Sequence, residues 1–339
     1  MNRLKLQSIA GALVAGALFL GALASSQTQS TISQPLSEPP PYWAYAANPP
    51  ASPSDSSTEF ADNAPQHIPG SKLTFTLPQV HDLFNAPDWH PSSHPPMPDI
   101  VARGRAPEVY ACAYCHLPNG QGRPENSSLA GLPAAYIIEQ LADFKSGARK
   151  SSDPDLLPVS NMITLETKAT DAEIQAAAAY FSALKPQPWI RVIEAKFVPK
   201  THVAGWMLVV STPHEMESIG NRIIETPENL DRTELRDDAS PFIAYVPPAS
   251  LKRGRTLVTT GGTNGKTIPC ATCHGPNLKG LRNVPSIAGR SPSYIVRQLF
   301  DMQSNARSGA SAQPMKPVVA NLSLDDIITI AAYTASLQP

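Results

Sequence analysis

The sequence predicts an all-α fold made of two tandem copies of one small helical domain. The first observation is an internal repeat: 18 of the 38 residues from Cys112 to Arg149 are identical to the residue 158 positions later. The second is that the spacing then becomes 153 and holds to the end, because the second copy is five residues shorter in one loop. The third is the helical periodicity of apolar residues after the repeated motif. Two constant spacings over this length indicate a duplicated domain.

The N-terminus has the pattern of a secretory signal peptide, which we expect to span residues 1–24. Arg3 and Lys5 supply its positive start, and residues 9–24 are apolar and small. The alternative is an uncleaved membrane anchor, but sixteen apolar residues fall short of the roughly 20 that span a bilayer. We therefore expect cleavage near Ala24 and an exported mature chain.

Composition divides the rest of the chain. Residues 25–72 are rich in Ser, Thr and Pro and poor in branched apolar residues, so we expect a flexible, disordered tether there. The first repeat is expected at 73–185, with an N-terminal extension at 73–100 packed on its surface. The second is expected at 251–339, after a non-repeated stretch at 186–250. We call these ranges the first unit, the second unit and the insertion.

Each unit is expected to contain a short helix before the repeated motif, an amphipathic middle helix and a final helix. Thr170 and Ser323 lie where the final helices begin, and acidic residues follow each of them, so both are predicted N-caps. The longer helices are expected at 136–147 and 171–184 in the first unit, and at 294–305 and 324–337 in the second.

The insertion resembles neither unit. Residues 189–198 and 203–211 are rich in branched and aromatic side chains, which favours β-strands, and an acidic stretch follows at 215–238. Sixty-five residues are too many for a bare linker in a compact protein. We expect a small β-containing element or a loop that docks a partner protein.

All four cysteines lie in two C-x-x-C pairs, and a histidine follows each pair directly. C-x-x-C-H is the attachment motif of c-type haem, in which two thiols add to the vinyl groups and the histidine binds the iron. A zinc site or two disulfides are the alternatives, but neither explains a histidine after each pair. We therefore expect two covalently attached haem c groups. The predicted haem-binding residues are Cys112, Cys115 and His116, and Cys270, Cys273 and His274.

The second axial ligand of each iron is expected to be a methionine, whose thioether raises the reduction potential and closes the iron to small ligands. Met162 and Met315 share the spacing of 153 and occupy the same place, in the loop before the final helix. A methionine more often fills a core. Met302, whose counterpart is Phe144, fits that description. We predict Met162 and Met315 as the axial ligands opposite the two histidines.

Two further repeated pairs have alternative interpretations. Arg149 and Arg307 recur at the end of the middle helices, where they either contact haem propionates or are exposed residues that favour the helix dipole. Tyr136 and Tyr294 either lie at a haem edge or pack in the core.

His90 and His94 have no counterpart in the second unit. Their spacing of four, with Met97 following, mimics a cluster of metal ligands. Pro91 lies between them and argues against the helix that such spacing needs. We favour no metal role for them.

The sequence resembles the dihaem class I cytochromes c of bacterial periplasms, which consist of two tandem cytochrome c domains. The resemblance rests on both C-x-x-C-H motifs, on Leu129-Ala130-Gly131 and Ile287-Ala288-Gly289, on the Tyr-x-x-x-Gln-Leu helices and on the two late methionines. It covers roughly 102–185 and 252–338, about half of the chain. It implies a soluble or membrane-attached electron carrier with His/Met haems. The insertion departs from the short linker usual in that family.

These features predict periplasmic electron transfer rather than catalysis. The expected redox partners are a dehydrogenase or respiratory donor and an oxidase or reductase acceptor, with the chain a free carrier or a subunit of a complex. Peripheral membrane association stays open. The alternative function is a dihaem peroxidase, which needs one open iron and is disfavoured by the matched methionines. A formal net charge of −1 does not suggest a nucleic-acid-binding protein, which would need a basic face.

Overall fold

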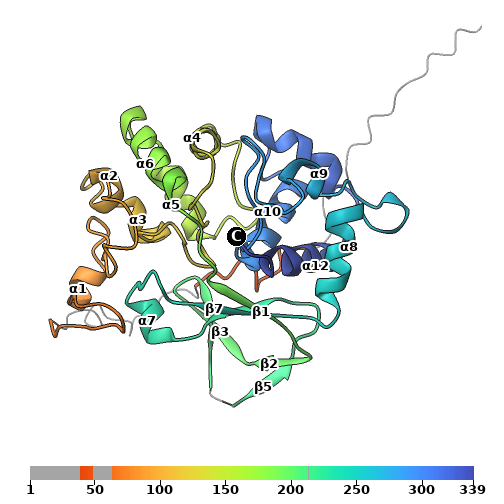
Figure 1. Cartoon of the computed structure of the whole chain (residues 1–339), viewed down its shortest axis with the longest axis horizontal. Coiled ribbons are helices and arrows are strands. Elements are labelled where there is room, and N and C mark those ends of the chain that lie inside the picture. The colour runs from red at the N-terminus through yellow and green to blue at the C-terminus, as the bar shows by residue number, and fades with distance from the viewer. Residues whose placement is uncertain (1–38, 49–62, 213) are drawn as a thin grey trace, which may run out of the picture. The chain divides into compact units, whose positions relative to one another are not determined.

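The computed structural model describes residues 39–48, 63–212 and 214–339 (Figure 1). The predicted signal peptide lies outside the described residues, as does part of the predicted tether. Residues 43–46, inside the predicted tether, are buried. Trp43 and Tyr45 belong to the same hydrophobic core as the second unit, and the Tyr45 hydroxyl donates to the Asp301 carboxylate at 2.7 Å. This packing corrects the prediction of a flexible tether throughout 25–72, because two large aromatic side chains are removed from water.

The first unit is helical and has its own hydrophobic core. Its longest helices contact each other, so that the buried faces of the middle and final helices meet. The middle helix ends at Gly147, which takes the left-handed conformation common at helix C-termini. The helices are α1 (Leu77–Val80), α2 (Asp99–Ala102), α3 (Cys112–His116), α4 (Ala134–Ser146), α5 (Leu157–Glu166) and α6 (Asp171–Ala183).

The second unit repeats this arrangement. Its first helix crosses its last at Gly254, where a Cβ atom would lie only 1.9 Å from the carbonyl oxygen of Thr329. Only glycine allows this approach. The elements are α8 (Ser250–Thr260), the 3₁₀ helix η1 (Thr263–Gly265), α9 (Ala271–His274), α10 (Pro292–Gln303), the 3₁₀ helix η2 (Ala310–Met315), α11 (Lys316–Val319) and α12 (Leu324–Ala335).

Both predicted N-caps of the final helices are confirmed. The Thr170 hydroxyl accepts from the Glu173 backbone N–H, and the Glu173 carboxylate accepts from the Thr170 N–H in return. Ser323 and Asp326 form the same reciprocal pair at the start of α12. Each capping box satisfies backbone donors that the first turn leaves without partners.

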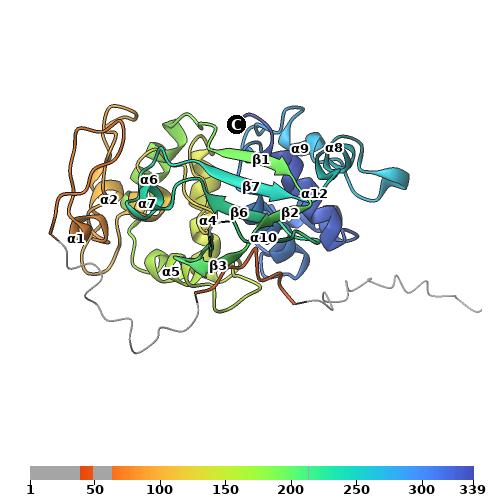
Figure 2. The same ribbon diagram turned by 90° about the horizontal axis from the view of Figure 1, so that it is seen from below.

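The insertion contains most of the β-structure, so all-α describes the two units but not the chain as a whole. Its first and last strands, β1 and β7, pair in parallel, and β6 pairs antiparallel with β7. β1 contacts α12 and β6 contacts α10, which joins this sheet to the second unit (Figures 1 and 2). The remaining strands form two antiparallel pairs, β2 with β5 and β3 with β4. The elements are β1 (Ile190–Glu194), β2 (Phe197–Pro199), β3 (Thr201–Ala204), β4 (Met207–Val210), β5 (Met216–Ser218), β6 (Ile224–Pro227), α7 (Leu230–Glu234) and β7 (Phe242–Val246).

In the part of the chain that the structure describes, no single helix is long and apolar enough to cross a bilayer. Two neighbouring helical segments, Ala310–Val319 and Leu324–Ala335, are together long and apolar enough to span a membrane, but the chain bends by 115° between them.

Candidate haem sites

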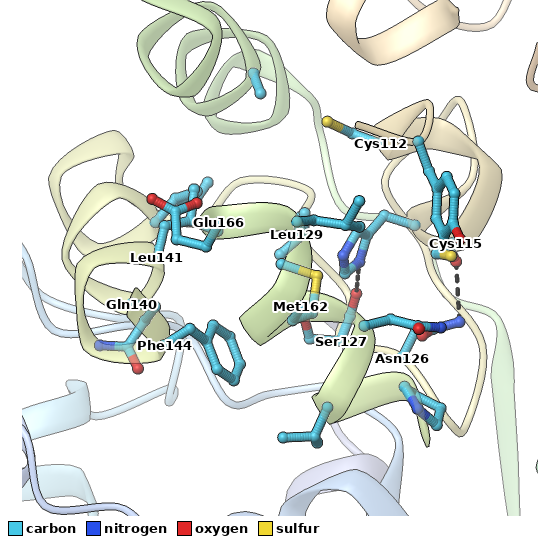
Figure 3. A pocket seen from close by; sticks show the side chains of 18 of the residues that line it. Cys112, Cys115, Asn126, Ser127, Leu129, Gln140, Leu141, Phe144, Met162 and Glu166 are labelled. Carbon is cyan, nitrogen blue, oxygen red and sulfur yellow. Dashed lines mark hydrogen bonds between the residues drawn. The ribbon is translucent and has the colours of Figure 1, made fainter. Parts of the chain in front are cut away.

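In the first unit, α3 presents its C-x-x-C-H motif to a cavity of about 470 Å³. The walls come mainly from α3 to α6, and apolar side chains alternate with many polar and charged ones. Figure 3 shows Cys112 and Cys115 at one side, Phe144 and Gln140 at the other, and Met162 between them. The volume lies within the roughly 300–1,000 Å³ usual for cofactor sites. The cavity and its donor set therefore fit a haem group.

The two histidines are buried and oriented in the same way. Nδ1 of His116 lies 2.9 Å from the carbonyl oxygen of Ser127, and Nδ1 of His274 lies 2.8 Å from that of Pro285. A carbonyl only accepts, so Nδ1 carries the proton and Nε2 keeps a free lone pair. Burial lowers the pKa of both imidazoles and favours this neutral form. Both rings are thus prepared as metal ligands.

The four cysteines are free thiols, so neither pair forms a disulfide. Burial raises the pKa of Cys112 to about 12 and that of Cys270 to about 11. Among the described residues, the only cluster of three or more metal-binding His, Cys, Asp or Glu side chains is His90 with Asp237 and Asp238. The cysteines therefore do not gather into a zinc site among the described residues.

The two predicted axial methionines lie in unlike elements. Met162 lines the cavity from α5, not from the predicted loop, because Pro158 in the first turn favours a helix start. Met315 ends the 3₁₀ helix η2 and, like Cys270, packs against the hydrophobic core of the second unit. The structure thus places each methionine with its own unit, and iron coordination by either remains a prediction.

Arg149 lies at the contact between the two units. Its guanidinium donates to the Tyr294 hydroxyl at 2.9 Å and to Gln298 Oε1 at 3.1 Å, both on α10 of the second unit. Arg149, Tyr294 and Gln298 all line the cavity of the first unit. The cavity is therefore closed in part by side chains of the other unit.

Arg307 makes the reciprocal contacts. It donates to the Tyr136 hydroxyl at 2.9 Å and to Gln140 Oε1 at 2.6 Å, both on α4. Two backbone hydrogen bonds of 2.8 and 2.7 Å flank the two arginines and join the chain segments antiparallel. Both arginines are less than 10% exposed, so the prediction of exposed helix-end residues is wrong. The tyrosines belong to this contact.

The insertion contributes two cavity residues that the sequence analysis missed, Trp206 and Arg236. Trp206 lies in the two-residue turn between β3 and β4, where it and Gly205 have φ values of 60° and 56°. Such a turn needs positive φ at both positions. Gly205 was the available turn indicator, but nothing local shows that the tip of this hairpin reaches another unit. Arg236 stacks over the Tyr114 ring at 3.6 Å.

His90 and His94 have separate acidic partners. Nε2 of His90 lies 3.0 Å from Asp237, and Nε2 of His94 lies 3.2 Å from Asp88. No helix forms between the two histidines, in agreement with the effect expected of Pro91.

The chain is similar to known cytochromes c. The family model "Cytochrome c" matches residues 101–185. Cytochrome c4 of Azotobacter vinelandii is 33% identical over 235 residues, which are 67% of this chain and 84% of that protein. A thiosulfate dehydrogenase electron acceptor of Thiomonas intermedia is 24% identical over 236 residues, or 69% of this chain and 81% of the relative.

Among solved structures, thiosulfate dehydrogenase (TsdBA) of Marichromatium purpuratum matches 70% of this chain at 26% identity, with a TM-score of 0.48. This chain covers 38% of the length of that protein. The cytochrome c4 relative, in contrast, is matched over most of its length. From that match, the duplicated motif and the cavity at α3, the chain belongs to the family of dihaem class I cytochromes c and carries two covalently bound haem c groups.

Proposed function

We propose that the chain is a periplasmic electron carrier whose haems are attached at Cys112/Cys115 and Cys270/Cys273. His116 and His274 are the proximal ligands, and Met162 and Met315 complete the two coordination spheres. The support is the oriented histidine in each unit, the place of Met162 in the cavity and the equivalent place of Met315 in the repeat. The identity to cytochrome c4 supports electron transfer as the task.

The one-electron chemistry is supplied by the haem irons when bound. The residues of this chain tune it. The carbonyl groups of Ser127 and Pro285 hold the histidines in one tautomer. The thioethers of Met162 and Met315 would favour the reduced state and keep small ligands from the irons. The apolar side chains of the cavity walls exclude water, which limits the reorganisation that accompanies each electron.

The observation that carries the proposal is the packing of the second unit against the haem cavity of the first. Tyr294 and Gln298 of the second unit line the cavity of the first. Neither Arg149 nor Arg307 forms an ion pair with a described carboxylate, and Nε of Arg307 is buried without a hydrogen-bond partner. The carboxylates of Asp143 and Asp301 interact with these arginines only electrostatically. We propose that haem propionates supply the missing negative charge. The interface would then bring the two cofactors close enough to exchange electrons.

The test of ligation is spectroscopy of the purified holoprotein and of its Met162→Ala and Met315→Ala variants. We expect two low-spin ferric haems in the wild type, and the loss of one methionine-to-iron charge-transfer band in each variant. A Met302→Ala variant is the control and should keep both bands. A high-spin ferric signal in the resting wild type would contradict two closed irons and would favour the dihaem peroxidase.

The donor we propose is a dehydrogenase, and two relatives at 24% and 25% identity are named thiosulfate dehydrogenase electron acceptors. We therefore expect a thiosulfate dehydrogenase with its substrate to reduce both haems in stopped-flow absorbance. Reduction by dithionite but not by this enzyme would remove that donor while leaving the carrier function intact. Co-purification of the two proteins would identify the chain as a subunit of a complex.

A further inference from the structure

The loop that follows the C-x-x-C-H motif differs in exposure between the two units. In the first unit, residues 117–125 are buried except for half-buried Asn119. In the second unit, most of the equivalent residues, 275–283, are exposed. Leu281 is 55% exposed, whereas its counterpart Arg123 is 7% exposed.

The fold of the loop does not cause this difference. Gly122 donates to the backbone oxygen of His116 at 2.9 Å, and Gly280 donates to that of His274 at the same distance. Both loops therefore turn back against their histidine in the same way. The two loops differ in which other chain segments pack against them.

In the first unit, the insertion lies on this loop. The Asn119 side chain donates to the backbone oxygen of Asp238 at 2.6 Å, and that of Gln121 donates to the backbone oxygen of Ser240 at 3.2 Å. Arg123 reaches the backbone oxygen of Thr233, near the end of α7, at 3.3 Å. Figure 1 shows α7 toward α3 and away from α9. The insertion thus occupies on the first unit a surface that is open on the second.

The same asymmetry extends to the motif itself. Arg236 covers the ring of Tyr114 and donates to its backbone oxygen at 2.7 Å. The counterpart of Tyr114 is Thr272, which is exposed. Cys273 is exposed, whereas Cys115 is half-buried. The surface around the C-x-x-C-H motif is therefore more accessible in the second unit than in the first.

The exposed surface around Cys273 is basic and apolar. Residues 239–300 contain no Asp or Glu and eight Lys or Arg, of which six are exposed. Two of these six, Arg253 and Lys266, form ion pairs with acidic residues of α12. Lys279 and Arg282 are exposed and form no ion pair with any described residue, and Ile268 and Leu281 are exposed apolar side chains. We call Ile268, Cys273, Lys279, Leu281 and Arg282 the haem-2 face.

We propose that the haem-2 face is the surface through which electrons enter or leave the protein, and that its occupant is a redox protein with carboxylates around an apolar patch. The insertion closes the equivalent face of the first unit, so that haem 1 exchanges electrons mainly through haem 2. This rests on the proposed carrier function. Charge complementarity selects the partner, because Lys279 and Arg282 attract carboxylates and repel the same face of a second copy. The insertion thereby has a covering role instead of the docking role that its length alone suggests.

The experiment uses the full holoprotein on gold electrodes that carry carboxylate-terminated or amine-terminated monolayers. A quartz microbalance reports the adsorbed mass, and voltammetry reports the rate of electron transfer. We expect adsorption and fast transfer on the carboxylate layer at low salt, and little of either on the amine layer. The double variant Lys279→Glu/Arg282→Glu should lose about ten-fold or more in rate, together with most of the adsorbed mass. Leu281→Ser should slow transfer with a smaller loss of mass.

The matched control is Lys168→Glu/Lys185→Glu, which makes the same charge change at exposed lysines of the first unit. It should behave like the wild type. Equal losses in both double variants, or none in the haem-2 variant, would overturn the assignment of this face. Dithionite and ferricyanide cycling in solution is measured in parallel. If both haems are reduced and reoxidised in solution but the two double variants adsorb alike, the assignment of the haem-2 face is wrong and the carrier function still holds. If the haems are not reversibly reduced, the carrier function itself is contradicted.

Discussion

At the scale of single residues, Glu166 makes the two haem environments chemically different. Its side chain lines the cavity of the first unit from α5, and the residue is 3% exposed. The equivalent residue in the repeat is Val319, which is apolar and buried. Burial raises the pKa of the Glu166 carboxyl. With haem in the cavity, the Glu166 carboxylate would stabilise the ferric form of haem 1, and Val319 would give haem 2 no such interaction.

We therefore predict that Glu166→Gln raises the reduction potential of haem 1 and leaves that of haem 2 unchanged. A charge about 10 Å away at an effective dielectric constant of about 20 contributes about 1–2 kcal/mol. For one electron this is about 40–80 mV. In the wild type, the potential of haem 1 should also rise as pH falls through the raised pKa of Glu166. Spectroelectrochemical titration against pH measures both effects, and equal shifts of both haems would contradict this assignment.

At the scale of elements, the start of α6 combines a capping box with an ion pair. The Arg105 guanidinium donates to the Glu173 carboxylate at 2.8 Å, and Glu173 also accepts from the Thr170 backbone. The Arg105 hydrogen bond, aided by the contacts of Thr170, lowers the pKa of Glu173 to about 2. One carboxylate therefore fixes both the first turn of α6 and its contact with the segment that follows α2.

This arrangement predicts a pH dependence of stability. A depressed folded-state pKa means that the contribution of Glu173 is complete above the unfolded value of about 4.5. It is lost as pH falls from there toward about 2. In Glu173→Gln, the free energy of unfolding should be lower at neutral pH, and its difference from the wild type should shrink below pH 4.5. Urea titrations at several pH values test this, and a constant difference across the range would argue against the ion pair.

Most helices could be predicted from local sequence, because capping residues mark where they begin. Thr170 and Ser323 mark the final helices through reciprocal caps, which depend on residues only three positions apart. The helical setting of Met162 was not predicted, because α5 has no clear amphipathic pattern and its start depends on Pro158. The strands of the insertion were predicted as segments. Their pairing was not, since β1 pairs in parallel with β7, about 50 residues later along the chain.

At the scale of the whole molecule, four side chains join the units through shared acceptors. Gln140 Oε1 accepts from Arg149 at 3.0 Å and from Arg307 at 2.6 Å. Gln298 Oε1 accepts from the same two arginines at 3.1 and 2.9 Å. Each glutamine thus bridges both guanidinium groups. The interface behaves as one network in which no pair is independent.

We predict that Arg307→Met lowers the free energy of unfolding by about 1.5–3 kcal/mol, because charged hydrogen bonds to Tyr136 and Gln140 are lost. The double variant with Arg149→Met should cost less than the sum of the single variants, since the two share acceptors. Arg307→Lys, which keeps the charge but cannot bridge, should slow electron exchange between the haems in flash photolysis. If the losses in unfolding free energy of the two single variants add exactly in the double variant, the two arginines act independently.

The contact between the two units is the part of the site that could not be predicted from the sequence. The repeat revealed Arg149 and Arg307, and it suggested contact with haem propionates or exposure to solvent. Their partners in the other unit depend on how the units pack, which no local pattern encodes. The same holds for Trp43 and Arg236, whose partners lie far away in the sequence. The haem motifs themselves are local, and for that reason they could be recognised at once.

The reciprocal contacts have a consequence for the origin of the protein. The arginine, tyrosine and glutamine of one unit meet the same three residue types of the other, as in the isologous interface of a symmetric homodimer. A single-unit ancestor with these residues would have associated with itself before the gene duplicated. Fusion then made the two partners permanent neighbours and allowed each to change alone. The insertion and Glu166 mark where that symmetry has since been broken.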